Sequence, residues 1–166
     1  SKQFLGMFED GWSPLTKKRH PLAPKTPTER LDTQRRRYDE YIANLDAEFG
    51  RLLDFMEKAR WLEKSYIFVT SDHGEMFERG VIGHSTPLLF EPVIRIPLII
   101  SSPGQTKRRD FYTITSNVDL LPTLLTIAGL PIPAWCEGKV LPGFGGNGDA
   151  ERSIFIIEAK KNPSFT

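Results

Sequence analysis

The residues best suited to chemistry form the run Ser71-Asp72-His73-Gly74-Glu75. It lies at the end of residues 65–71, whose β-branched and aromatic side chains predict a strand covered on both faces. In open α/β sheets, ligands bind outside the carboxyl ends of the strands. Asp72 offers a carboxylate oxygen and His73 a ring nitrogen, and both can reach one divalent cation from a turn that Gly74 permits. The run predicts a metal site; a purely structural turn is the alternative.

A second histidine follows eleven residues after the first, in the glycine-containing loop of residues 80–86. His84 could donate a hydrogen bond to an anionic substrate oxygen or protonate a leaving group, because imidazole titrates near neutral pH. Two histidines in one loop system favour a polar site. A surface histidine without such a role is the other interpretation.

A long helix must lie before this strand. Between Thr33 and Arg60 the apolar residues recur with α-helical spacing on one face, namely Tyr38, Tyr41, Ile42, Leu45, Phe49, Leu52, Leu53 and Met56. This face is expected to be core. Gly50 costs about 1 kcal/mol relative to Ala in such a helix, and close packing against its backbone would explain its presence.

The remaining pattern predicts further strands and one short helix. The strands are expected at residues 3–8, 94–101 and 154–157. The helix runs from Val118 to Ala128, with Ser116 or Asn117 as its cap and Gly129 at its end. Asp119 lies where a carboxylate favours the positive end of the helix dipole. A helix followed by a buried strand is typical of α/β folds with a parallel sheet.

The composition excludes several classes of function. Twenty-two basic and 21 acidic side chains give a net charge of +1, which provides no attraction for nucleic acid. No apolar run approaches the roughly 20 residues of a membrane-spanning helix. Cys136 is the only cysteine, so neither an internal disulfide nor a cysteine-rich metal cage is expected. Because the sequence does not begin with methionine, we expect an upstream part of the parent protein.

Three ordered segments resemble the C-terminal part of the catalytic domain of sulfatases, within the alkaline phosphatase superfamily. They are YIFVTSDHGE at residues 66–75, GHSTPLLFEPVIRIPLII at residues 83–100 and VDLLPTLLTIAGLP at residues 118–131. The resemblance implies an α/β fold, an alkaline phosphatase-like three-layer sandwich with a mixed, mostly parallel central sheet flanked by helices. Residues 1–166 would then be a single partial domain.

The resemblance also implies site residues and a reaction. Asp72 and His73 correspond to family ligands of a single divalent metal ion, Ca²⁺ or, given an Asp-His pair, Mn²⁺. His84 stands where many relatives have a lysine that contacts the sulfate or the leaving group. The implied partner is a sulfate ester. Hydrolysis of a phosphonate or phosphodiester is an alternative, and a non-catalytic sulfatase-like domain is another.

The sequence also departs from the family pattern. Sulfatases make a formylglycine nucleophile in a Cys/Ser-x-Pro/Ala-x-Arg motif, which this sequence lacks. The nucleophile and an Asp-Asp pair of metal ligands are therefore expected upstream, and the chain alone is expected to be inactive. Trp12 stands where the family has a catalytic histidine, and whether His20 takes that role is left open. Glu91 and Arg95 are interpreted as an ion pair of the scaffold.

Overall fold

The computed structural model describes residues 2–9, 17–19, 21, 23, 26–84 and 89–157. It contains two compact units, Ser1–Gln105 and Thr106–Thr166. Trp12 and His20 lie outside the described residues. None of the helices that the structure describes is long and apolar enough to cross a membrane.

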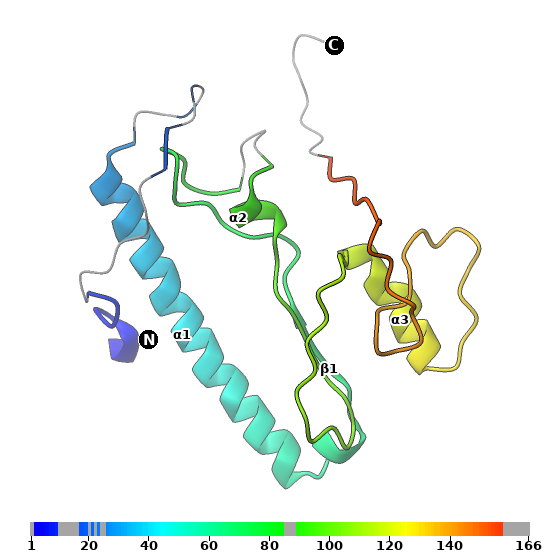
Figure 1. Ribbon diagram of the computed structural model, residues 1–166. Coiled ribbons are helices and arrows are strands. Elements are labelled where there is room, and N and C mark those ends of the chain that lie inside the picture. The colour runs from blue at the N-terminus through cyan, green and yellow to red at the C-terminus, as the bar shows by residue number, and fades with distance from the viewer. Residues whose placement is uncertain are drawn as a thin grey trace. The chain divides into compact units, whose positions relative to one another are not determined.

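The first unit contains the predicted long helix, α1, over Thr28–Lys58 (Figure 1). It begins directly after Pro27, whose extended backbone cannot continue a helix in the N-terminal direction. Its first turn carries Glu29, which favours the positive end of the helix dipole. One turn later, Arg35 and Asp39 form an ion pair of 2.7 Å. The helix is therefore confirmed, with a start about one turn earlier than its apolar pattern indicates.

The apolar face of α1 is largely exposed, so the expectation that it forms core is wrong for most of its length. Leu31 is buried, and the ring of Tyr38 lies 5.3 Å from that of Phe77. Further along, the side chains of Tyr41 and Leu45 are 73% and 62% exposed. The apolar periodicity identifies the face of α1 that needs other apolar side chains to pack against. It does not show that the rest of the described chain supplies those side chains.

Gly50 lies in this exposed half of α1. A Cβ atom added there would meet nothing within 4 Å. The idea that another backbone packs closely against Gly50 is therefore wrong within the described structure.

Two short strands follow α1 and the 3-10 turn η2, Leu62–Lys64. Strand β1, Ile67–Thr70, pairs with β2, Leu98–Ser101, in an antiparallel register. An antiparallel pair is compatible with the expected mixed sheet, but the described strands include no parallel pair. A parallel connection needs a crossover, usually a full helix, whereas the helix described between these strands is the single turn α2, Glu91–Ile94.

The strands are also less buried than their apolar sequences predict. Ile99 in β2 is 64% exposed, and burial alternates along that strand. The strand expected at residues 3–8 is wrong as well, because residues 2–4 form the 3-10 turn η1 and residues 5–8 continue as turns. The core of this unit lies instead in the segment between β1 and β2, where Met76 and Val81 form a buried cluster with Val93 of α2.

The second unit contains the predicted short helix, α3, over Leu120–Ile127. It continues from the 3-10 turn η3, Asn117–Asp119, and Ser116 caps that turn through a reciprocal capping box with Asp119. Gly129 ends the helix at φ +68°, a left-handed conformation that glycine adopts without a Cβ penalty.

The strand expected at residues 154–157 does not form. These residues have no strand assignment, and the side chains of Phe155 and Ile157 are 89% and 85% exposed. A strand is stabilised by its pairing with a neighbour, and the described chain pairs β1 only with β2. The apolar composition of residues 154–157 is therefore insufficient to make a strand here.

Candidate functional site

The candidate site begins where β1 ends, as the sequence predicts. The Ser71 hydroxyl donates a hydrogen bond to the carbonyl oxygen of His73, which closes a tight turn around Asp72. The backbone N–H of His73 donates to Oδ1 of Asp72 at 2.9 Å. The two predicted metal ligands are therefore held on one turn by local hydrogen bonds.

The ring of His73 has a defined hydrogen-bond partner. Its Nδ1 lies 2.9 Å from the carbonyl oxygen of Gly74. Because a carbonyl only accepts, Nδ1 carries the proton, and in the neutral ring the lone pair is on Nε2. A backbone carbonyl bonded to the other ring nitrogen is a common way to orient a metal-binding histidine.

The geometry of Asp72 and His73 fits a shared cation. Oδ2 of Asp72 and Nε2 of His73 lie 3.6 Å apart, and two ligand atoms that are each about 2.0 to 2.4 Å from one ion are typically roughly 3 to 4 Å apart. The pKa of Asp72 is lowered, first by the backbone N–H of His73 and then by the charge of His73. The carboxylate therefore stays ionised, as a metal ligand must.

Gly74 joins this turn to the segment that carries α2. Its N–H donates to the carbonyl oxygen of Val93 at 2.8 Å. A Cβ atom added at Gly74 would lie 2.0 Å from the carbonyl oxygen of Pro92. Gly74 is not among the residues with positive φ, so glycine is required here by the close approach of two backbones rather than by the conformation of the turn.

Residues 75–84 form a loop that brings its two ends together. The N–H of Gly83 donates to the carbonyl oxygen of Met76 at 2.9 Å. Met76 is completely buried, and Val81 on the same loop is 1% exposed, so the apolar core fixes the loop. Glu75 and His84 directly flank the hydrogen-bonded pair of Met76 and Gly83, and they meet across it.

This closure places His84 beside the first histidine. Nδ1 of His84 lies 2.9 Å from Oε2 of Glu75, and the rings of His73 and His84 are 3.9 Å apart between centroids, with a tilt of 34°. One ligand atom from each of His73, Glu75 and His84 lies within 4.8 Å of the others. The structure thus brings all three predicted site residues, Asp72, His73 and His84, into one region.

Glu75 is the member of this cluster that sequence reasoning missed. It belongs to the run after β1, but its sequence position gives no sign that it contacts His84. The sequence feature that could have predicted this contact is the pair of glycines at positions 80 and 83, because such glycines mark a loop whose two ends can come together.

The family model of sulfatases matches residues 2–130 of this chain. This chain belongs to the sulfatase family. The match spans the turn with Asp72 and His73, the loop with His84 and helix α3, so it covers the first two segments of the sequence resemblance and all of the third except its last residue.

Curated relatives show the same membership. Choline-sulfatase from Rhizobium meliloti (strain 1021) is 36% identical over 117 residues, 68% of this chain and 22% of the relative. Arylsulfatase K from Rattus norvegicus is 30% identical over 120 residues, 72% of this chain and 21% of the relative. A putative extracellular sulfatase Sulf-1 homolog from Caenorhabditis elegans is 34% identical over 112 residues, 66% of this chain and 16% of the relative. The chain therefore spans about a fifth of the length of these sulfatases.

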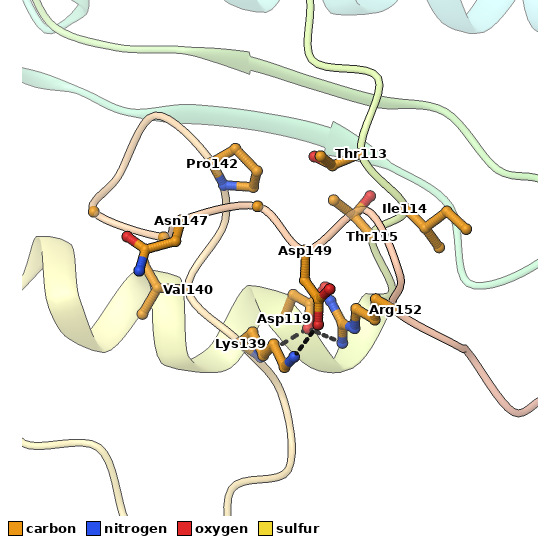
Figure 2. Close-up of a pocket in the computed structure, with 13 residues that line it drawn as sticks. Thr113, Ile114, Thr115, Asp119, Lys139, Val140, Pro142, Asn147, Asp149 and Arg152 are labelled. Carbon is orange, nitrogen blue, oxygen red and sulfur yellow. Dashed lines mark hydrogen bonds and ion pairs between the residues drawn. The ribbon is translucent and has the colours of Figure 1, made fainter.

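The second unit of this sulfatase-family chain contains a cavity of about 350 Å³, whose wall includes the glycine-rich residues 145–148 (Figure 2). Its basic side chains are compensated. Arg152 donates to both oxygens of Asp119 at 2.6 and 2.7 Å, and Lys139 lies 2.9 Å from Asp149. These pairs leave the cavity walls electrically balanced, which does not suit the binding of a sulfate group.

Asp119 organises this second unit. Its side chain is buried and also accepts hydrogen bonds from the backbone N–H groups of Ser116 and Lys139. Burial raises the pKa of Asp119. The hydrogen bonds from Arg152 and from the two backbone groups lower the pKa by more than burial raises it, so the net pKa lies below the usual value. The sequence predicts Asp119 at a helix start, and the structure adds its role as the central hydrogen-bond acceptor of this unit.

Proposed function

We propose that the parent protein hydrolyses sulfate esters, and that this chain contributes the Asp72 and His73 ligands of one divalent metal ion together with His84. The observation that carries the proposal is the 3.6 Å separation of Oδ2 of Asp72 and Nε2 of His73 at the end of β1, in a chain of the sulfatase family. The whole fold proposed for the parent is an alkaline phosphatase-like three-layer sandwich, of which residues 1–166 form one partial domain.

The metal ion, when bound, stabilises negative charge on the nucleophile and on the sulfuryl oxygens. The role of this chain is to hold the two ligands before the ion arrives. The Gly74 carbonyl orients the ring of His73, and the backbone N–H of His73 orients the carboxylate of Asp72. Ca²⁺ suits the carboxylate, whereas an Asp-His pair also suits Mn²⁺.

His84 is proposed to assist departure of the alcohol. A carboxylate only accepts hydrogen bonds, so Nδ1 of His84 donates to Glu75 and Nε2 is directed away from that bond. The side chain of His84 is 49% exposed, which leaves it accessible to a substrate. A protonated imidazole can give a proton to the leaving oxygen as the ester bond breaks.

The remaining parts of the active site are proposed to lie outside this sequence. The relatives are about five times as long as the part they share with this chain, and the formylglycine motif is absent here. The exposed apolar face of α1 supports the same proposal, because a large uncovered apolar face in a domain normally has a partner.

The test is hydrolysis of an aryl sulfate by the parent protein and its variants. Replacement of either metal ligand, Asp72→Ala or His73→Ala, is expected to lower kcat/KM by at least about 100-fold, and added Ca²⁺ or Mn²⁺ should not restore it. Glu91→Ala serves as the matched control, because Glu91 is an exposed carboxylate whose only described ion pair, to Arg95, is 3.8 Å long. Equal activity of the Asp72→Ala variant and the wild type would disprove the proposal.

Hydrolysis of a phosphonate or phosphodiester is the second candidate. The observation that favours it is the imidazole of His73 in the ligand pair, since nitrogen ligands suit transition metals better than Ca²⁺. The two candidates are separated by the ratio of kcat/KM for a sulfate ester to that for the matching phosphodiester. A ratio below one in the Mn²⁺-loaded parent protein would favour the second.

A further inference from the structure

We propose that His73, Glu75 and His84 form an alternative cation site for a zinc-type transition metal ion, which competes with the Asp72–His73 pair because both use the one lone pair of His73. The binding does not depend on the proposed hydrolytic function. It follows from the arrangement of three side chains on one closed loop.

The chemical types of the three ligands match such an ion. Two imidazoles and one carboxylate are a common ligand set for Zn²⁺, and a solvent-facing fourth position is usual in such sites. Ca²⁺ and Mg²⁺ instead require mainly oxygen ligands. The three ligand atoms lie within 4.8 Å of one another, and ligand atoms around Zn²⁺ lie about 3.3 to 3.5 Å apart, given bonds of about 2.1 Å. Rotations of the two partly exposed imidazoles can close the difference.

The available lone pairs are compatible with this set. Nε2 of His73 carries the lone pair because Nδ1 donates to the Gly74 carbonyl. Nδ1 of His84 points at Oε2 of Glu75, 2.9 Å away. A cation that enters between these two atoms replaces the proton that they share.

The loop supports the site before the ion binds. Glu75 and His84 are brought together by the hydrogen bond between Gly83 and Met76, whose side chain is buried in the core. Gly83 has φ +98°, and a Cβ atom there would lie 3.4 Å from Oε1 of Glu75. The three side chains are 41%, 20% and 49% exposed for His73, Glu75 and His84, respectively, so an ion can enter from solvent without unfolding of the loop.

Co²⁺ is the probe, because its visible absorption reports both binding and coordination geometry. The chain is titrated with Co²⁺, and Zn²⁺ is then added in competition. We expect an intense absorption typical of four-coordinate Co²⁺, which Zn²⁺ removes. His84→Ala and Glu75→Gln should each weaken binding by at least about 100-fold, because loss even of a second-shell partner costs about 10- to 100-fold.

One matched control and one comparison separate this site from the pair proposed for hydrolysis. Glu91→Gln, which alters an exposed carboxylate of α2, should leave Co²⁺ affinity within about threefold of wild type, and Asp72→Asn should weaken binding less than His84→Ala does. Circular dichroism of each variant checks that α1 is retained. Absence of Co²⁺ binding by the wild-type chain would overturn the proposal. So would a pattern in which Asp72→Asn abolishes binding and His84→Ala does not, since the ion would then occupy the Asp72–His73 pair.

Discussion

Nδ1 of His84 lies 2.9 Å from Oε2 of Glu75, although nine residues separate them in the sequence. The contact exists because Gly83 and Met76 are hydrogen-bonded between them. Glu75 therefore acts as a positioning residue: its carboxylate fixes the orientation of the His84 ring and makes Nδ1 the donor. This relationship determines which ring nitrogen of His84 can face a substrate.

Replacement of Glu75 should therefore impair His84 without unfolding the chain. In the parent protein, Glu75→Gln is expected to lower kcat for sulfate ester hydrolysis by about 10-fold and to change its pH profile, because an orienting partner of a functional histidine contributes about 10- to 100-fold. Glu91→Gln is the matched control and should leave both unchanged. An identical pH profile for Glu75→Gln and wild type would contradict the positioning role.

Gly74→Ala should destabilise the first unit. The added Cβ atom would lie 2.0 Å from the carbonyl oxygen of Pro92, which belongs to the backbone and cannot rotate away. Overpacking of this kind costs about 1 to 3 kcal/mol, and we expect the upper part of that range. Urea unfolding followed by circular dichroism measures the effect. Unchanged stability would mean that the backbones of Gly74 and Pro92 are further apart than described.

Gly50→Ala should have the opposite sign. Apart from the neighbouring backbone of α1 itself, no atom of the described residues lies within 4 Å of the added Cβ, and the position is in the interior of α1. Alanine is favoured over glycine in a helix by about 1 kcal/mol, so the free energy of unfolding is expected to rise by about that amount. The same urea experiment serves both substitutions. If Gly50→Ala lowers the stability of the parent protein, another segment packs against this backbone there.

The ion pair of Asp119 and Arg152 should make the second unit sensitive to acid. Because the pKa of Asp119 is lowered in the folded state, its contribution to stability is complete above about pH 4, where the unfolded carboxyl is ionised. That contribution is lost as pH falls through the lowered folded pKa. Thermal unfolding between pH 7 and pH 2 should show this loss.

The Asp119→Asn variant tests the assignment of that loss. Removal of one partner from a buried pair costs about 3 to 5 kcal/mol, so we expect a lower melting temperature at pH 7. The dependence of stability on pH below about 4 should also become shallower, because the titrating group is gone. Asp149→Asn, at the exposed pair with Lys139, is the control. An equally steep acid transition in the Asp119→Asn variant would assign the transition to another group.

The 166-residue chain by itself should show no sulfatase turnover. It carries Asp72, His73 and His84 but no formylglycine motif, so it lacks the group that attacks sulfur. The assay compares hydrolysis of an aryl sulfate by the wild-type chain and by its Asp72→Ala variant. Wild-type turnover above that of the variant would show that a nucleophile within these residues had been overlooked.

The sequence by itself determined the two main helical segments and the chemical types of the residues at the site. The apolar periodicity predicts α1, and Ser116 and Gly129 mark the two ends of the short helical segment that contains α3, because caps depend on the residue type at a single position. The run from Ser71 to Glu75 identifies the turn that carries the two proposed metal ligands. These features depend on residues close together in the chain, which is why the pattern was sufficient.

The tertiary structure alone decided which distant groups meet. The pairing of Glu75 with His84 depends on a loop closed by core packing, and that of Asp119 with Arg152 spans 33 residues. The antiparallel direction of β1 and β2, and the absence of a strand at residues 154–157, likewise depend on which backbone lies alongside. Hydrophobic pattern and propensity describe each segment's own preference, whereas contacts between segments depend on how the whole chain packs.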